Sequence, residues 1–181
     1  MAPKLLQEQQ KTTFEGLKSE MGWSNLMQAP KVEKVVVSVG VGKMIKEKGK
    51  LELIADRLGK ITGQKAVTRG AKKAIATFKT RIGDTVGYQT TLRGKRAEDF
   101  LNRLVHIALP RTKDFRGLSD SAIDEMGNFT LGIKDNTVFP ETSEEELKDV
   151  FGMAITIVTT AHNKKEAKSY LSHLGFPFKK S

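Results

Sequence analysis

The chain has 181 residues and a formal net charge of +10, with 38% hydrophobic residues, 29% charged residues and no cysteine. This composition is ordinary for a globular protein, and it excludes a disulfide framework and a thiolate metal site. Neither a run of roughly 20 apolar residues nor a secretory signal is present, so we expect a cytoplasmic protein with no membrane partner.

The first half of the chain alternates helical and extended patterns. Apolar residues spaced by three and four predict helices, and β-branched or alternating patterns predict strands. In chain order we expect a helix at 4–21, a strand at 31–40, a helix at 50–61, strands at 65–69 and 75–80, a basic turn at 81–85 and a strand at 86–93.

The second half continues this mixture. We expect a helix at 95–109 stopped by Pro110, a long connection, a strand at 128–134, a short helix opened by a capping box at 143–146, a strand at 152–160 and a last helix capped by Asn163 and ended by Gly175. Without βαβ alternation, this order predicts the α+β class: an antiparallel β-sheet with helices packed on one face. We expect a single domain over residues 1–181, with an N-terminal helix within 1–23.

A β-branched strand runs into GVGK at 40–43, which raises the question of a nucleotide site. A phosphate-binding loop needs glycine at Val37 and Ser or Thr at Met44, and a dinucleotide fingerprint needs glycine at Ile45. The three histidines lack metal-ligand spacing, and there is no nucleophile elbow. We therefore expect no enzyme, no cofactor, no metal and no small-molecule substrate.

The positive charge is concentrated in one third of the chain. Residues 60–116 hold 14 Lys and Arg against 4 Asp and Glu, whereas the remainder holds 17 of each sign. Concentrated basicity favours a polyanionic partner. An anionic membrane surface is disfavoured because no basic amphipathic helix with exposed aromatic residues accompanies the charge. Composition alone does not separate RNA from DNA.

Residues 86–93 alternate between two faces. Val86, Tyr88, Thr90 and Leu92 form the expected core face, and Gly87, Gln89, Thr91 and Arg93 form a polar face. Basic residues surround these predicted strands: Lys65, Arg69, Lys72, Lys73, Lys79, Arg81, Arg93, Lys95 and Arg96. Hydrogen-bonding side chains accompany them at Gln64, Gln89, Thr90 and Thr91. Because we expect Phe78 and Tyr88 in the core, aromatic stacking has little support, and we predict recognition of folded RNA by shape and backbone rather than by splayed single-stranded bases.

Eight segments resemble one protein family in order and spacing, from about Ser24 to Phe178. They are MQAPKVEKVVVSVGVG, ITGQKAVTRGAKKAIATFK, VGYQTTLRG, LPRTKDFRGLS, GNFTLGIK, VFPE, ITIVTTA and LGFPF. The chain is similar to the bacterial large-subunit ribosomal protein L5 family, which carries 5S rRNA; the first 23 residues match only in helical character.

The resemblance implies a single α+β domain in the central protuberance that binds 5S rRNA and contacts 23S rRNA. Its RNA-recognition positions match at Gln64 and Thr91, and Ser38 stands where the family usually has Asn. With the basic residues, the expected RNA-binding set is Ser38, Gln64, Arg69, Lys72, Lys73, Thr91 and Arg93.

Two further contacts are implied. The family's loop at the elbow of P-site tRNA corresponds to Phe78, Lys79 and Arg81, and its bridge to small-subunit ribosomal protein S-thirteen involves the stretch with Arg111, Lys113 and Arg116. The chain departs from the family at Met126, Phe151 and Ala154. The rival functions are an RNA-processing enzyme on the same basic face and a free RNA-binding translation regulator.

Overall fold

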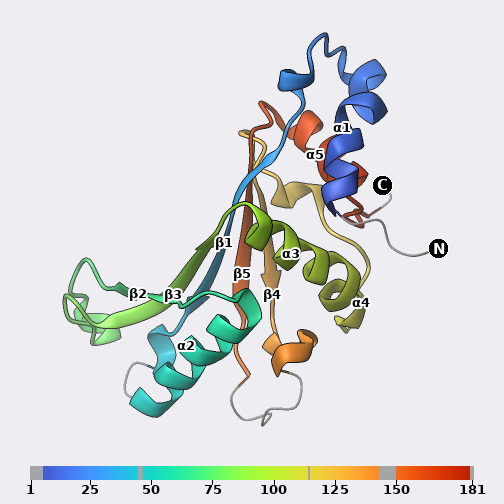
Figure 1. Cartoon of the computed structure of the whole chain (residues 1–181). Helices are drawn as coiled ribbons and strands as arrows, with labels where there is room; N and C mark the ends of the chain where they lie inside the picture. Colours follow the sequence, from blue (N-terminus) through green and yellow to red (C-terminus); the bar gives the residue numbers. More distant parts are fainter. Residues whose placement is uncertain (1–5, 45–46, 114, 143–149, 180–181) are drawn as a thin grey trace. The chain divides into compact units, whose positions relative to one another are not determined.

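The computed structural model describes residues 6–44, 47–113, 115–142 and 150–179 (Figure 1). Five strands form one sheet in the order β2-β3-β1-β5-β4. They are β1 (Val32–Gly40), β2 (Val67–Gly70), β3 (Thr85–Leu92), β4 (Phe129–Ile133) and β5 (Met153–Thr159). Neighbouring strands run antiparallel, as β2 and β3 do. The predicted α+β class with an antiparallel sheet is confirmed.

The helices account for most of the remaining regular structure. They are α1 (Leu6–Met21), α2 (Lys48–Thr62), α3 (Lys95–Arg103), α4 (Leu109–Arg111) and α5 (Lys164–His173). Short 3₁₀ turns lie at Leu26–Gln28, Gly42–Met44, Ala76–Phe78, Asp120–Ala122, Asn136–Val138 and Pro140–Thr142. Among the described residues, none of the helices combines the length and the apolar character needed to cross a membrane. The capping box predicted at 143–146 lies outside the described residues.

Contacts divide the chain into two compact units. Unit 1 comprises Met1–Val35, Arg93–Leu131 and Thr156–Ser181, and unit 2 comprises Val36–Leu92 and Gly132–Ile155. The strands β1, β4 and β5 contribute residues to both units. The expectation of a single domain stays a prediction.

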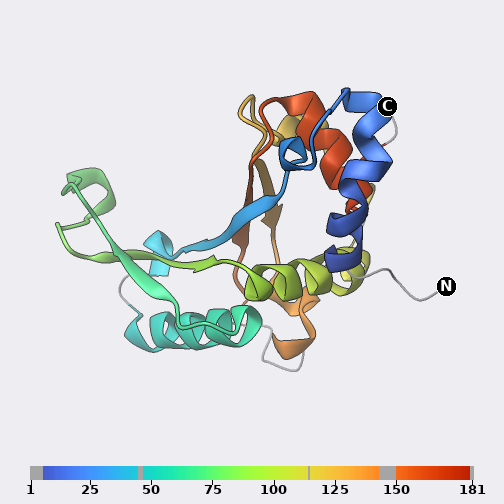
Figure 2. The same ribbon diagram turned by 45° about the horizontal axis from the view of Figure 1, so that its top comes forward.

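In unit 1, α1 and α5 lie side by side in both views (Figure 1, Figure 2). The Ser169 hydroxyl donates to Glu20 at 3.0 Å, and the ring of His173 lies so close to Gly16 that a Cβ there would be 2.9 Å from its Cε1. The α5 helix begins as predicted, because the side chain of Asn163 accepts a hydrogen bond from the backbone N–H of Glu166 at 2.9 Å.

Tyr170, on α5, is part of the unit 1 core. Its side chain is fully buried, and its hydroxyl accepts a hydrogen bond from the Gln10 amide. Burial raises the pKa of Tyr170 to about 12, so its phenol stays neutral at physiological pH.

In unit 2, α2 lies alongside the β2–β3 hairpin (Figure 1, Figure 2). Ile54, Leu58 and Ile61 recur at helical spacing and are at most 2% exposed, as the pattern predicts. Gly63 ends the helix with a left-handed φ of 65°, and its N–H donates to the carbonyl of Gly59 at 2.8 Å. The backbone therefore leaves α2 at Gly63 in a defined conformation, and Gln64 is the next residue.

The prediction that Pro110 stops the helix at 109 was wrong. After α3 the chain makes a π-helical turn over Leu104–Ala108, in which the N–H of Leu109 donates to the carbonyl of Leu104. Pro110 then lies inside α4, which ends at Arg111. Proline lacks an N–H and is tolerated in the first turn of a helical segment, so the π turn lets the helix continue past it.

Candidate nucleic-acid interface

The strand β3 presents one face to the core of unit 2 and one polar face away from it. Tyr88, Thr90 and Leu92 are buried, whereas Gln89 and Thr91 between them are half-buried. The predicted alternation is therefore confirmed from Tyr88 to Arg93, whereas Val86, expected in the core, is half-buried and Gly87, expected on the polar face, is buried. Thr90, which we had included among the RNA-contacting groups, is only 1% exposed, so its hydroxyl faces the core and cannot reach a large ligand.

Pairing with β2 extends this polar face. Val67 is opposite Gln89 and Arg69 is opposite Gly87, so both β2 side chains share a face with Gln89 and Thr91. The guanidinium Nε of Arg69 donates to Oε1 of Gln89 at 2.6 Å. This bond holds a predicted cation against the sheet, and it reveals Gln89 as a positioning partner.

The structure brings Gln64 and Thr91 together. The Gln64 side-chain amide donates to the backbone carbonyl of Thr91 at 3.3 Å, although the two residues are 27 positions apart. The hydroxyl of Thr62 holds the preceding turn, because it donates to the carbonyls of Leu58 at 2.7 Å and of Gln64 at 3.0 Å. The half-buried Gln64 side chain is thus held beside the half-buried Thr91 before any ligand arrives.

Ser38 lies on β1, the other neighbour of β3 in the sheet. It is half-buried between the buried Val37 and Val39, so it points to the face opposite the core. Its hydroxyl donates to the carbonyl of Ala154 on β5, at a long 3.5 Å. We call the set Ser38, Gln64, Arg69, Gln89 and Thr91 the polar sheet face.

Residues 71–84 close the β2–β3 hairpin, and we call them the hairpin tip. The backbone N–H of Ala71 donates to Asp84 at 2.8 Å, and the N–H of Gly83 donates back to Ala71 at 3.0 Å. Further out, Ile75 and Thr80 exchange two hydrogen bonds of 3.2 Å. In both views this segment forms the free end of the hairpin (Figure 1, Figure 2).

The strand predicted at 75–80 was wrong. Only a single bridge joins Ile75 and Thr80, and Ala76–Phe78 form a 3₁₀ turn between them. Lys79 closes this turn in the left-handed region with φ of 52°, the only non-glycine residue with positive φ among those described. The apolar and polar residues at 75–80 therefore form a tight turn with exposed apolar side chains and not a strand with a buried face.

The hairpin tip carries cations and apolar groups together. Its cations are all exposed: Lys72, Lys73, Lys79 and Arg81. Phe78 is 72% exposed and Ile82 is 74% exposed, so the expectation of Phe78 in the core was wrong, whereas Tyr88 is in the core as expected. The sequence analysis did not identify Ile82. The available signal was its place inside a basic turn between two glycine-containing segments.

Arg93 and the three cations of the expected bridge to the small subunit lie in unit 1. Arg93 comes directly before Gly94 and α3, and Arg111 ends α4. Lys113 and Arg116 lie in the connection that follows. All four side chains are exposed.

The three departures have different surroundings. Met126 is 72% exposed, whereas Phe151 is 5% exposed in unit 2 and its N–H donates to the Asn136 side chain at 3.2 Å. Ala154 is half-buried on β5 and its carbonyl accepts from Ser38. Phe151 thus adds to the core of unit 2.

Comparisons with known proteins point to one family. Residues 25–81 match the family model described as ribosomal protein L5, and residues 85–178 match the one described as the ribosomal L5P family C-terminus. These matches indicate a ribosomal protein that combines an exposed basic hairpin with a hydrogen-bonded polar sheet face.

Curated relatives match over nearly the whole chain. Large ribosomal subunit protein uL5 of Flavobacterium johnsoniae is 46% identical over 179 residues, which cover 99% of this chain and 98% of that protein. The uL5 proteins of Trichlorobacter lovleyi and Acholeplasma laidlawii are 45% and 48% identical, over 94% and 91% of this chain and 95% and 91% of theirs. The chain belongs to the ribosomal protein L5 family.

Proposed function

We propose that the chain is a structural constituent of the large ribosomal subunit and binds 5S rRNA through the polar sheet face and the hairpin tip. The observation that carries the proposal is the hydrogen bond between Gln64 and Thr91. It joins the two positions that the family resemblance assigns to RNA recognition, and Thr91 lies on the hairpin that also carries the exposed cations of the tip. Membership of a ribosomal-protein family supports the predicted non-enzymatic role.

The proposed mechanism divides the work between two kinds of group. The polar sheet face holds amide, guanidinium and hydroxyl groups in fixed positions, where they contact bases and 2′-hydroxyls. The exposed cations neutralise phosphates and release counterions. If about 6–10 phosphates of a duplex-like target are neutralised, affinity falls by roughly 10³–10⁵ between 50 and 200 mM salt.

Further contacts complete the proposed role in the cytoplasmic ribosome. Arg93 adds a phosphate contact, and 23S rRNA lies next to the bound 5S rRNA. Phe78, Lys79 and Arg81 contact the elbow of P-site tRNA. Such a contact requires the ring and both cations to be exposed, and all three are exposed in the hairpin tip. Arg111, Lys113 and Arg116 contribute to a bridge to small-subunit ribosomal protein S-thirteen.

Fractionation of ribosomes on a sucrose gradient tests this function. We expect about one copy of the protein per large subunit, and 5S rRNA as the RNA recovered with the protein after mild dissociation of the subunit. Protein found only in the ribosome-free fractions would indicate a free regulator. Cleavage of labelled RNA in the presence of Mg²⁺ would indicate a processing enzyme.

A further inference from the structure

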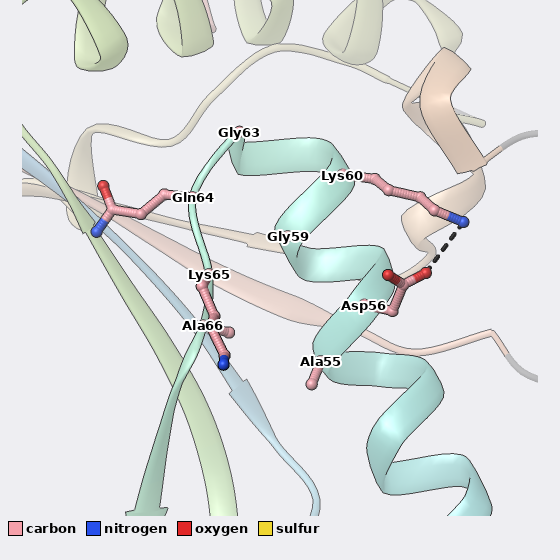
Figure 3. A pocket seen from close by; sticks show the side chains of 8 residues that line it. All are labelled: Ala55, Asp56, Gly59, Lys60, Gly63, Gln64, Lys65 and Ala66. Carbon is pink, nitrogen blue, oxygen red and sulfur yellow. Dashed lines mark ion pairs between the residues drawn. The ribbon is translucent and has the colours of Figure 1, made fainter.

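A hollow of about 670 Å³ lies in unit 2 between the last turns of α2 and residues 64–66, which follow it (Figure 3). Its size falls within the roughly 300–1,000 Å³ that is usual for small-ligand sites. The resemblance assigns no role to α2, and the polar sheet face does not include this hollow. It does share Gln64 with that face.

The walls of the hollow are made of small residues. Ala55 and Gly59 lie on α2, Gly63 is its cap, and Ala66 lies on the facing segment (Figure 3). A Cβ placed on Gly59 would meet only the carbonyl oxygen of Gln64, at 3.8 Å, and one on Gly63 would meet nothing within 4 Å. Small residues on both sides therefore leave a space that a flat, uncharged group can enter.

Charged groups occupy the edges of the hollow. Lys60 is paired with Asp56 at 3.0 Å on the α2 side, and both side chains are more than half exposed. Lys65 is exposed on the facing segment, so that two lysines and one aspartate line the hollow together with its alanine and glycine residues. This arrangement suits a ligand with a neutral planar body and anionic groups on either side of it.

Gln64 connects the hollow to the proposed RNA-binding surface. Its side chain points away from α2 in Figure 3, and its amide reaches the carbonyl of Thr91. Gln64 therefore belongs both to the lining of the hollow and to the polar sheet face. We propose that the hollow receives one unstacked nucleobase of the bound RNA, and that Lys60 and Lys65 contact the flanking phosphates. The inference rests on the proposed function.

Substitution of Gly59 tests the inference without removing a polar group. Gly59→Leu fills the hollow from the α2 wall, and Gly59→Ala fills it partly. The matched control is Gly49→Leu, because Gly49 also lies in α2, also has open space around its Cβ position and does not line the hollow. Both leucine variants should melt at or above the wild-type temperature, since leucine favours a helix over glycine.

The readouts are gel shifts with a 5S rRNA transcript and dimethyl sulfate probing of the complex. We expect Gly59→Leu to weaken binding about tenfold, Gly59→Ala to weaken it less and Gly49→Leu to change it less than twofold, because the excluded base no longer buries its apolar surface in the hollow. We also expect one or two nucleotides to lose protection in the Gly59→Leu complex only, with the remaining footprint intact.

Equal affinity and equal footprints for the two leucine variants would overturn the inference and leave the proposed function standing. Micromolar binding of free nucleoside monophosphates, lost in Gly59→Leu while its RNA footprint stays complete, would also overturn it, because the hollow would then serve a free nucleotide. A wild-type protein that fails to bind the transcript would overturn both proposals.

Discussion

The polar sheet face and the hairpin tip both belong to unit 2, yet their side chains are held differently. On the sheet face, Gln64 and Arg69 each donate to a group on β3, and Thr91 is half-buried. At the tip, Lys72 and Lys73 are exposed on a turn closed by backbone hydrogen bonds. Fixed groups discriminate between RNA sequences and shapes, whereas exposed cations respond to phosphate density. We therefore expect the face to determine specificity and the tip to supply salt-dependent affinity.

The largest effect is expected from reversing charge at the tip. Lys72→Glu together with Lys73→Glu should weaken 5S rRNA binding by about 10–100-fold and lower the slope of log affinity against log salt by about 2, because each lost duplex phosphate contact removes about 0.9. Salt-titrated gel shifts measure both quantities. The control is Lys164→Glu with Lys165→Glu, an exposed pair at the start of α5 in unit 1. Equal effects from the two pairs would mean that net charge, and not the tip, governs affinity.

The next effect disturbs the sheet under the polar face without touching the tip. A Cβ on Gly87 would lie 2.9 Å from the backbone oxygen of Val39, and both strands are paired on two sides in the sheet. Gly87→Ala should therefore lower the free energy of unfolding by about 1–3 kcal/mol, measured by urea denaturation. Gly40→Ala on β1 is the control, since nothing lies within 4 Å of its Cβ position. A wild-type midpoint for Gly87→Ala would show that β1 and β3 tolerate a wider spacing.

A smaller and more specific effect is expected at Thr91. Thr91→Val keeps the shape of the side chain and the backbone carbonyl that accepts from Gln64, and it removes only the hydroxyl. The loss should be about 1 kcal/mol in 5S rRNA binding, with no change in binding to an unrelated structured RNA. Thr68→Val, whose side chain is exposed and shares the opposite face with Tyr88, should leave 5S rRNA binding unchanged. An equal loss on both RNAs would deny Thr91 a part in specificity.

The smallest effect is expected at Phe78. Because its ring is 72% exposed, Phe78→Ala should change the free energy of unfolding by less than about 0.5 kcal/mol and 5S rRNA affinity by less than twofold. Thermal melting and the same gel shifts measure these values. Phe100→Ala in the unit 1 core is the contrast and should cost about 3–5 kcal/mol. Destabilisation of similar size at Phe78 would show that the ring packs against the protein.

Elements with a clear period or cap could be predicted from the sequence. The apolar spacing of α2, the alternation of β3 from Tyr88 on and the pairing of Asn163 with Glu166 each correspond to a local rule that the structure obeys. The structure of the segment around Phe78 could not be predicted, because its apolar residues lie in an exposed turn. Apolar residues in such a pattern normally face a core. Pro110 misled for another reason: a π turn, which has no sequence signature, accommodates it.

The candidate site was predictable in composition but not in geometry. Thr91 follows from strand alternation, whereas its bond to Gln64 depends on the left-handed cap at Gly63, which redirects the chain after α2. The expected cluster of cations also proved to be divided: Lys65 to Arg81 lie in unit 2, and Arg93, Lys95 and Arg96 lie in unit 1. A count of charges along the sequence does not show to which compact unit each charged residue belongs.

The most direct test measures affinity for 5S rRNA and for an unrelated structured RNA across a salt series, for the Lys72/Lys73 charge reversal and for Thr91→Val side by side. The division of work between tip and face predicts a lower salt slope with an unchanged ratio of the two affinities for the first variant, and a lower ratio with an unchanged slope for the second. Two variants that alter the same quantity would contradict that division.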